Sequence, residues 1–189
     1  MEVRNDYVIN TDAKVILNQY DEFGSLCSLV FEGEDIYSVK ASPLTIVKKS
    51  IEYYGHSLQG AIAGAKSALG KISMPPVKIS GKLGIYWFPV KSIMHEDHIW
   101  ISIDHIADYY ALSDKTVTVI FHDGSDIAVE SSYNSFERKV NRALKYKNIM
   151  VNRTNGESLN SSNKLKGHGI ERDPARKQYR YVSRKDYEK

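Results

Sequence analysis

Two helical segments set between strand-forming segments are the feature that most limits the fold of this chain. Ser42 followed by Pro43 is typical of a helix start, because serine caps free backbone N–H groups and proline suits the first helical position. A second helix is predicted from Ser57 to Gly70, since glycine is a common stop signal. Pro75 and Pro76 then break any helix at that point. Helices inserted into a strand-rich chain indicate an α+β fold.

The segments on both sides of this helical pair have the residue alternation and the turn residues of β-strands. Strands are predicted over residues 14–20, 26–31, 36–39, 77–79, 85–88, 99–104, 116–121 and 126–130. The first three predict an antiparallel meander, and Asp123-Gly124 predicts a hairpin with a type I′ turn between the last two. We therefore expect a single domain with a mostly antiparallel sheet and about three helices.

The third helix is expected to begin with Ser135 as its cap. Its core-facing side chains are predicted to be Phe136, Val140, Ala143 and Leu144. Arg138, Arg142 and Lys145 then share the outer face as a basic stripe. Beyond residue 152 the chain is polar with little apolar periodicity, so residues 1–152 are predicted as the folded domain and 153–189 as a flexible, basic tail.

Charge is distributed unevenly along the chain, although the net charge is only +3. Residues 1–35 contain two bases and eight acids, and residues 96–133 contain one base and eight acids. Residues 53–95 contain five lysines and no acid, and residues 134–156 contain six bases and one acid. Such segregation attracts polyanions, because lysine and arginine release the counterions condensed on phosphates. An unevenly charged but inert solvated surface is the alternative explanation.

The sequence offers no pattern typical of an enzyme or a metal site. His95 and His98 are three residues apart outside a predicted helix, which is not the spacing of a helical zinc site. Asp104 and His105 are adjacent on a predicted strand and would point to opposite faces. The nucleophile elbow, the Walker loop and the dinucleotide fingerprint are all missing from the sequence. We expect no catalytic residue, no metal and no cofactor.

The remaining sequence features predict a cytoplasmic protein. No run approaches the ~18 apolar residues of a membrane span, and the first twenty residues lack the pattern of a secretory signal. Cys27 is the single cysteine and lies in an apolar strand, where cysteine is usually a small core residue. A reducing compartment is consistent with this cysteine content.

Several sequence segments, in a consistent order along the chain, resemble those of a known family. They are Pro43-Leu44-Thr45-Ile46-Val47, Ser50, Gly55-His56-Ser57-Leu58-Gln59-Gly60, Lys71-Ile72-Ser73-Met74-Pro75-Pro76-Val77, Phe88-Pro89, Trp100-Ile101-Ser102 and Ser132-Tyr133-Asn134-Ser135-Phe136-Glu137. Over residues 7–150 the chain resembles the ComK family of bacterial competence transcription factors. The resemblance implies a homodimer or tetramer that binds paired A/T-rich boxes in double-stranded DNA through the minor groove and activates DNA-uptake genes. It also implies RNA polymerase and the MecA/ClpC proteolytic machinery as partners.

The chain departs from the family pattern at two positions. Ala61 stands where family members usually carry a basic residue, and His98 stands where a cysteine is common. A diverged paralogue is therefore one reading, and a protein-interaction regulator that pairs with or antagonises a more typical activator is the alternative. RNA binding has less support because no RNP-like aromatic strand occurs.

The helices and the basic segments supply the candidate DNA contacts. Lysine and arginine bind phosphates, and glutamine is among the side chains that read the minor groove. The candidates are Lys48, Lys49, Ser57, Gln59, Lys66, Lys71, Lys78, Arg138, Arg142 and Lys145.

Overall fold

The fold is known from a computed structural model, which describes residues 1–91, 99–155, 168–173 and 178–183. The chain divides into two units, Met1–Val151 and Asn152–Lys189, which are described separately. The first unit holds two sheets and nearly all of the three α-helices of the described residues. The α+β class expected from the sequence is confirmed.

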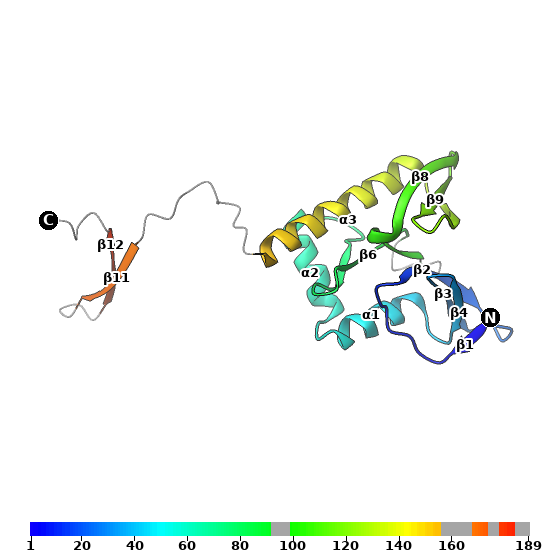
Figure 1. Cartoon of the computed structure of the whole chain (residues 1–189), viewed down its shortest axis with the longest axis horizontal. Coiled ribbons are helices and arrows are strands. Elements are labelled where there is room, and N and C mark those ends of the chain that lie inside the picture. Colours follow the sequence, from blue (N-terminus) through cyan, green and yellow to red (C-terminus); the bar gives the residue numbers. More distant parts are fainter. Residues whose placement is uncertain (92–98, 156–167, 174–177, 184–189) are drawn as a thin grey trace. The chain divides into compact units, whose positions relative to one another are not determined.

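The larger sheet of the first unit has seven strands in the order β1-β4-β3-β2-β7-β6-β5 (Figure 1). Its strands are β1 (Glu2–Arg4), β2 (Ala13–Tyr20), β3 (Leu26–Glu32), β4 (Asp35–Val39), β5 (Val77–Ser80), β6 (Ile85–Pro89) and β7 (Ile99–Ser102). Every neighbouring pair is antiparallel except β1 with β4. The predicted meander is confirmed as β2-β3-β4, and β5 lies at the far edge of the sheet.

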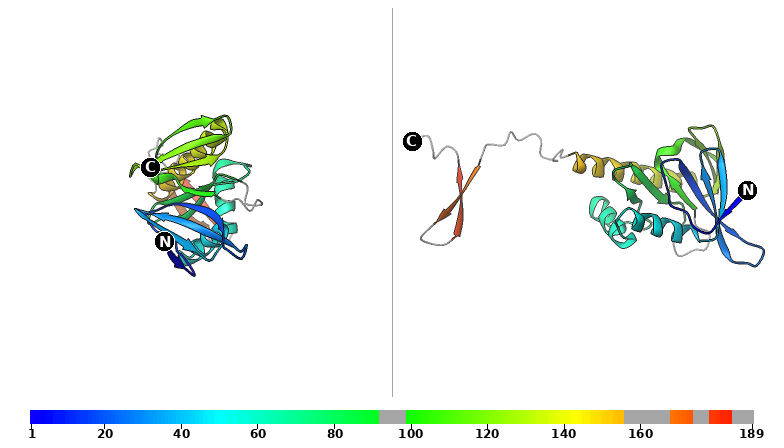
Figure 2. Two further views of the ribbon diagram at one scale, coloured as in Figure 1. Left: turned by 90° about the vertical axis from the view of Figure 1, so that its right-hand side faces the viewer. Right: turned by 60° about the horizontal axis from the view of Figure 1, so that its bottom comes forward.

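The smaller sheet has the order β10-β9-β8 and is antiparallel throughout. A 3-10 turn, Ile103–His105, connects β7 to it, and its strands are β8 (Ile106–Ser113), β9 (Thr116–Phe121) and β10 (Asp126–Glu130). The long helix α3 (Tyr133–Thr154) follows β10 and runs beside this sheet (Figure 2).

Two shorter helices connect β4 to β5, as the local sequence predicts. Helix α1 (Pro43–Tyr53) starts at Ser42, whose hydroxyl oxygen accepts a hydrogen bond from the Thr45 backbone N–H at 3.2 Å. Helix α2 (Leu58–Leu69) starts at Ser57 and ends at Gly70. Gly70 has φ of +87°, a conformation that residues with a Cβ rarely adopt, so glycine is required at this stop.

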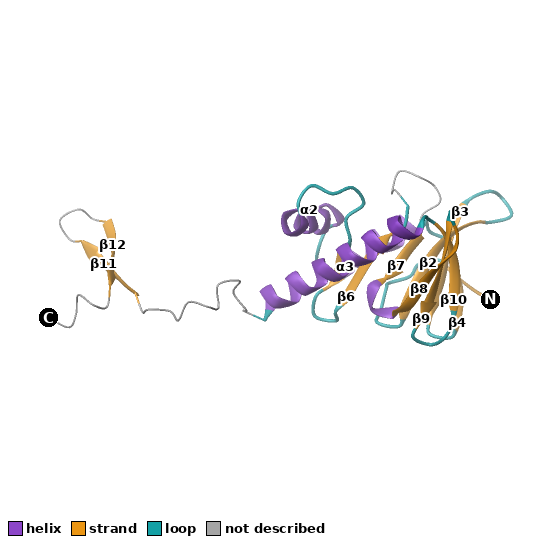
Figure 3. Cartoon of the chain, turned by 90° about the horizontal axis from the view of Figure 1, so that it is seen from above, coloured by secondary structure: helices purple, strands orange, loops and turns teal. Residues whose placement is uncertain are grey.

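Both faces of the seven-stranded sheet are covered, which explains why β6 is buried along its whole length. Trp87 faces one core together with Ile46 and Ile51 of α1. Its neighbours Tyr86 and Phe88 face a second core, which α3 and the smaller sheet complete. Figure 3 shows α3 along one side of the strands, and α2 contributes residues to both cores.

Three local predictions are wrong, each for a physical reason. The β9–β10 turn is not type I′, because that type needs positive φ at both central residues, and Gly124 has φ of +81° but Asp123 does not have a positive φ. The strands are joined by a three-residue loop instead, across which the backbone N–H of Phe121 donates a hydrogen bond to the Ser125 carbonyl oxygen at 2.8 Å. Helix α3 begins at Tyr133, so Ser135 lies inside its first turn and is not its cap. Leu144 is 43% exposed, since Tyr146 occupies the core position instead.

Strand β8 is absent from the sequence prediction. Only Ile106 and Tyr109 are partly buried among its eight residues, so no clean alternation marks it. The predicted strand continuing to Asp104 also ends earlier, because residues 103–105 form the 3-10 turn.

The second unit contains a two-stranded antiparallel sheet of β11 (His168–Asp173) and β12 (Gln178–Ser183). This hairpin is regular structure in a segment where the sequence predicts only a flexible tail. The rest of that predicted tail, residues 156–167, 174–177 and 184–189, lies outside the described residues.

Candidate nucleic-acid interface

The basic stripe predicted on α3 is present on the flank of the helix away from the core. Arg138 and Lys145 are exposed and Arg142 is half-buried. Lys139, next to them in sequence, turns inward instead and donates a hydrogen bond to the Val90 carbonyl oxygen at 2.5 Å. Burial lowers the pKa of Lys139, and the nearby charges of Arg138 and Arg142 lower it further. The stripe is therefore a cluster of positive charges, and a bound polyanion would reduce the repulsion between them.

A hollow of about 320 Å³ lies where α2, β5 and α3 meet. Ser57 and Lys78, both candidates from the sequence, line it together with Gly64 of α2 and Tyr146 of α3. A Cβ added at Gly64 would lie 3.6 Å from the Tyr146 hydroxyl oxygen, which is ordinary contact distance. Tyr146 therefore lies beside Gly64 and leaves room for a Cβ there.

Ser57 has a structural role at this hollow. Its hydroxyl oxygen accepts a hydrogen bond from the Gly60 backbone N–H at 3.1 Å and caps α2. The first backbone N–H groups of α2 and the positive end of its dipole therefore lie beside the hollow, where they favour negative charge.

The other candidates do not converge on the hollow. At 100° per residue, Lys66 lies about 160° around α2 from Gly64, and Gln59 is on the same far flank. Lys71 follows α2 and is exposed. Lys48 and Lys49 are exposed on α1, across the sheet from α3, and Lys48 lies 3.8 Å from a carboxylate oxygen of Glu52.

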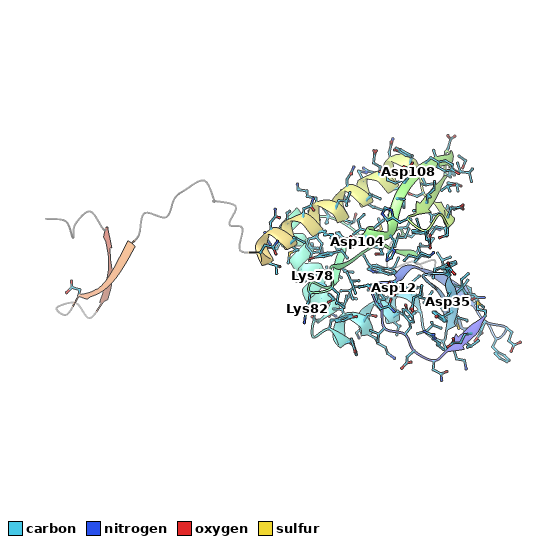
Figure 4. All side chains as sticks on the ribbon, in the orientation of Figure 1. Asp12, Asp35, Lys78, Lys82, Asp104 and Asp108 are labelled. Atoms are coloured by element: carbon cyan, nitrogen blue, oxygen red, sulfur yellow. The ribbon has the colours of Figure 1, made fainter. Side chains whose placement is uncertain are left out.

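Most of the candidate cations nevertheless lie around one edge of the larger sheet and along α3. Helix α2 and strand β5 lie at the sheet edge between α1 and α3, so the bases wrap around this edge. Figure 4 shows Lys78 and Lys82 at this edge, Asp35 and Asp108 toward the opposite end, and Asp12 and Asp104 between them. Of the cations that make no ion pair within the described part of the chain, seven lie around this edge and along α3: Lys66, Lys71, Lys78, Lys82, Arg138, Arg142 and Lys145. We call this set the basic end.

Sequence reasoning missed several residues of this region. Lys82, exposed between β5 and β6, is not one of them, because it ends the Lys71–Lys82 segment that the sequence predicts to contact DNA. His56, Tyr146 and Met150 line the hollow, but nothing in their local sequence indicates it. Ala61, where the family pattern expects a base, also lines the hollow and is half-buried.

The residues considered for catalysis have structural contacts. Asp104 accepts a hydrogen bond from the Lys147 ammonium, and the His105 Nε2 atom lies 2.8 Å from the Thr11 carbonyl oxygen. Cys27 is buried in β3, as predicted. His95 and His98 lie outside the described residues. In the described ranges, no group of three or more His, Cys, Asp or Glu residues is placed to hold a metal ion, and no helix has the length and apolar character to cross a membrane.

Comparisons with known proteins give a consistent result. The family model described as ComK protein matches residues 4–155. The competence transcription factor of Bacillus subtilis (strain 168) is 31% identical over 119 residues, which is 63% of this chain. The match covers 62% of that protein's own length, so the chain spans less than two thirds of this curated relative. No solved structure matches the chain.

Proposed function

The chain belongs to the ComK family, and we propose that it is a cytoplasmic transcription factor that binds double-stranded DNA and activates competence genes. The relative whose name carries this activity is matched over part of its length, so the activity is transferred here as a proposal. A non-enzymatic role follows from the same relationship.

The observation that carries the proposal is the basic end. Seven cations without ion pairs lie around one edge of the sheet and along α3, while Asp35 and Asp108 lie toward the other end (Figure 4). A cation that already has a carboxylate partner gains little from a phosphate, because binding must first break the existing pair. Cations without partners release counterions from DNA at no such cost.

We place the α2–α3 hollow against the DNA backbone. Lys78 and the start of α2 would bind a phosphate there, and Arg142 would bind a neighbouring phosphate. Gln59 and Lys66, on the far flank of α2, would then be the side chains that reach toward the floor of the minor groove. A homodimer or tetramer would place two such surfaces on two A/T-rich boxes.

Inosine substitution tests the choice of groove. An inosine·cytosine pair has the minor-groove edge of A·T, because it lacks the guanine amino group, but the major-groove edge of G·C. We expect duplexes with inosine·cytosine boxes to bind about as tightly as A/T-rich boxes. Affinity equal to that of G·C boxes would show that the major groove is read, and would contradict the proposal.

A second candidate is a regulator that acts through a more typical family activator. Ala61 favours it, because the hollow lacks the positive charge that the family pattern places there. Weak binding to every duplex, combined with tight binding to a family activator, would select this role. RNA polymerase and the MecA/ClpC machinery are proposed partners in either role.

A further inference from the structure

An apolar pocket of about 100 Å³ lies between α1, α2 and the sheet, separate from the hollow described above. Leu44 of α1 and Ile62 of α2 form two of its walls, and Met74 and Trp100 contribute from the loop before β5 and from β7. For comparison, a cavity of about 150 Å³ is enough to bind benzene. The pocket is smaller than that cavity and has room for part of one aromatic ring.

Two features of this pocket are costly in the protein as it stands. The indole N–H of Trp100 is buried and has no hydrogen-bond acceptor among the described residues. Met74 has φ of +51°, and it is the one non-glycine residue of the described chain with positive φ. Orphaned buried donors and left-handed residues are uncommon and collect at sites that receive a ligand. Met74 and Trp100 both line this pocket, and the buried indole N–H of Trp87 on β6 also has no acceptor among the described residues.

The rim of the pocket is basic. Lys48 follows Leu44 by one helical turn on α1, and Lys66 follows Ile62 by one turn on α2, so each lysine lies beside a pocket residue. Both lysines are exposed, but Lys48 lies 3.8 Å from a Glu52 carboxylate oxygen, so Lys66 is the rim lysine that makes no ion pair within the described residues. An apolar pocket with a lysine on its rim is complementary to an apolar side chain that lies beside a carboxylate.

The turn between β2 and β3 presents such a side chain. Phe23 is 85% exposed, more than any other large apolar residue of the described chain. The Asp21 carboxylate holds the turn by accepting hydrogen bonds from the backbone N–H of Phe23 at 2.9 Å and of Ser25 at 2.8 Å. Glu22 precedes Phe23 and is exposed. A turn fixed in advance loses little conformational freedom on binding.

We propose that the Phe23 turn of one copy of this chain docks in the apolar pocket of a second copy. Part of the phenyl ring enters the pocket, and Glu22 meets Lys66 on the rim. The Phe23 turn and the apolar pocket are both accessible on the surface of the chain. Their polarity and charge are complementary. Because they are different surfaces, the contact joins copies head to tail unless two of them close a dimer.

Self-association of the full chain without DNA tests the proposal independently of DNA binding. Sedimentation velocity over a range of concentrations is measured for the wild type, Phe23→Ala and Leu112→Ala, the last being a 60% exposed apolar residue on β8. We expect Phe23→Ala to weaken association at least about tenfold and Leu112→Ala to have no effect. A wild type that stays monomeric to about 100 µM, or a Phe23→Ala variant that associates normally, would overturn the proposal.

Charge reversal provides the second test. Glu22→Lys and Lys66→Glu are each expected to weaken association several-fold, and the variant carrying both is expected to recover it, because the pair is restored with opposite signs. Both residues are exposed, so the fold is retained and circular dichroism verifies this. A double variant no better than the single variants would refute the pairing of these residues.

Discussion

Removal of Arg138 and Arg142 together should change the salt dependence of DNA binding as well as its strength. Both side chains belong to the basic end, and neither makes an ion pair within the described residues. Neither is a core residue, so Arg138→Ala and Arg142→Ala leave the packing of Phe136 and Val140 intact. The double variant therefore isolates the interaction with phosphates.

The size of the effect follows from counterion release. Each phosphate contact on B-form DNA contributes about 0.9 to the slope of log affinity against log salt. Loss of two contacts lowers the slope by about 1.8, so between about 50 and 200 mM salt the wild type loses about 12-fold more affinity than the double variant.

Fluorescence anisotropy with one labelled duplex at four or more salt concentrations measures these slopes. Lys115→Ala is the matched control, because Lys115 is exposed between β8 and β9, outside the basic end. The control should keep the wild-type slope. A double variant with the wild-type slope would remove the α3 stripe from the interface and refute its assignment as a phosphate contact.

Three further predictions follow from single features of the fold. Ala61→Lys adds a positive charge at the hollow and should raise DNA affinity several-fold by anisotropy; an unchanged affinity would separate the hollow from the DNA. Gly70→Ala should destabilise by about 1–2 kcal/mol in urea unfolding because of its positive φ, whereas Gly64→Ala should stabilise by up to about 1 kcal/mol. A hydrogen bond from the buried Lys14 ammonium holds the pKa of Asp123 well below its usual 3.8. The free energy of unfolding should therefore fall as the pH drops below 3.8. In Lys14→Met, the decrease in the free energy of unfolding between pH 7 and pH 3 should be smaller than in the wild type.

Much of the fold is predictable because local chemistry determines it. Ser42 and Ser57 cap their helices through hydrogen bonds three residues ahead, and Gly70 ends α2 through a conformation open to glycine, so the sequence alone locates α1 and α2. The meander and the β9–β10 hairpin follow from residue alternation in the same way.

The errors arise where tertiary contacts, and not the local sequence, determine which residues are buried and where strands form. Helical spacing permits either Leu144 or Tyr146 in the second core, and the contact of α3 with α2 and β6 selects Tyr146, whose ring lies edge-on to Tyr86 at 5.9 Å. Strand β8 has no periodic signal because its smaller sheet leaves most of it exposed.

The candidate site shows the same division. Sequence composition identified the bases, but it could not show that Lys78 and Tyr146 line one hollow while Lys66 lies on the far flank of α2. Residues far apart in the chain come together there through the packing of α2, β5 and α3. The apolar pocket at Met74 and Trp100 likewise has no local sequence signal.

The central claim is that the basic end binds double-stranded DNA with a preference for A/T-rich boxes. The most direct test is a titration of the purified chain against duplexes that carry two A/T-rich boxes or two G/C-rich replacements, at two salt concentrations. The account predicts tighter binding to the A/T-rich duplex at both salt concentrations. Weak binding that disappears at the higher salt, with equal affinity for the two duplexes, would contradict it.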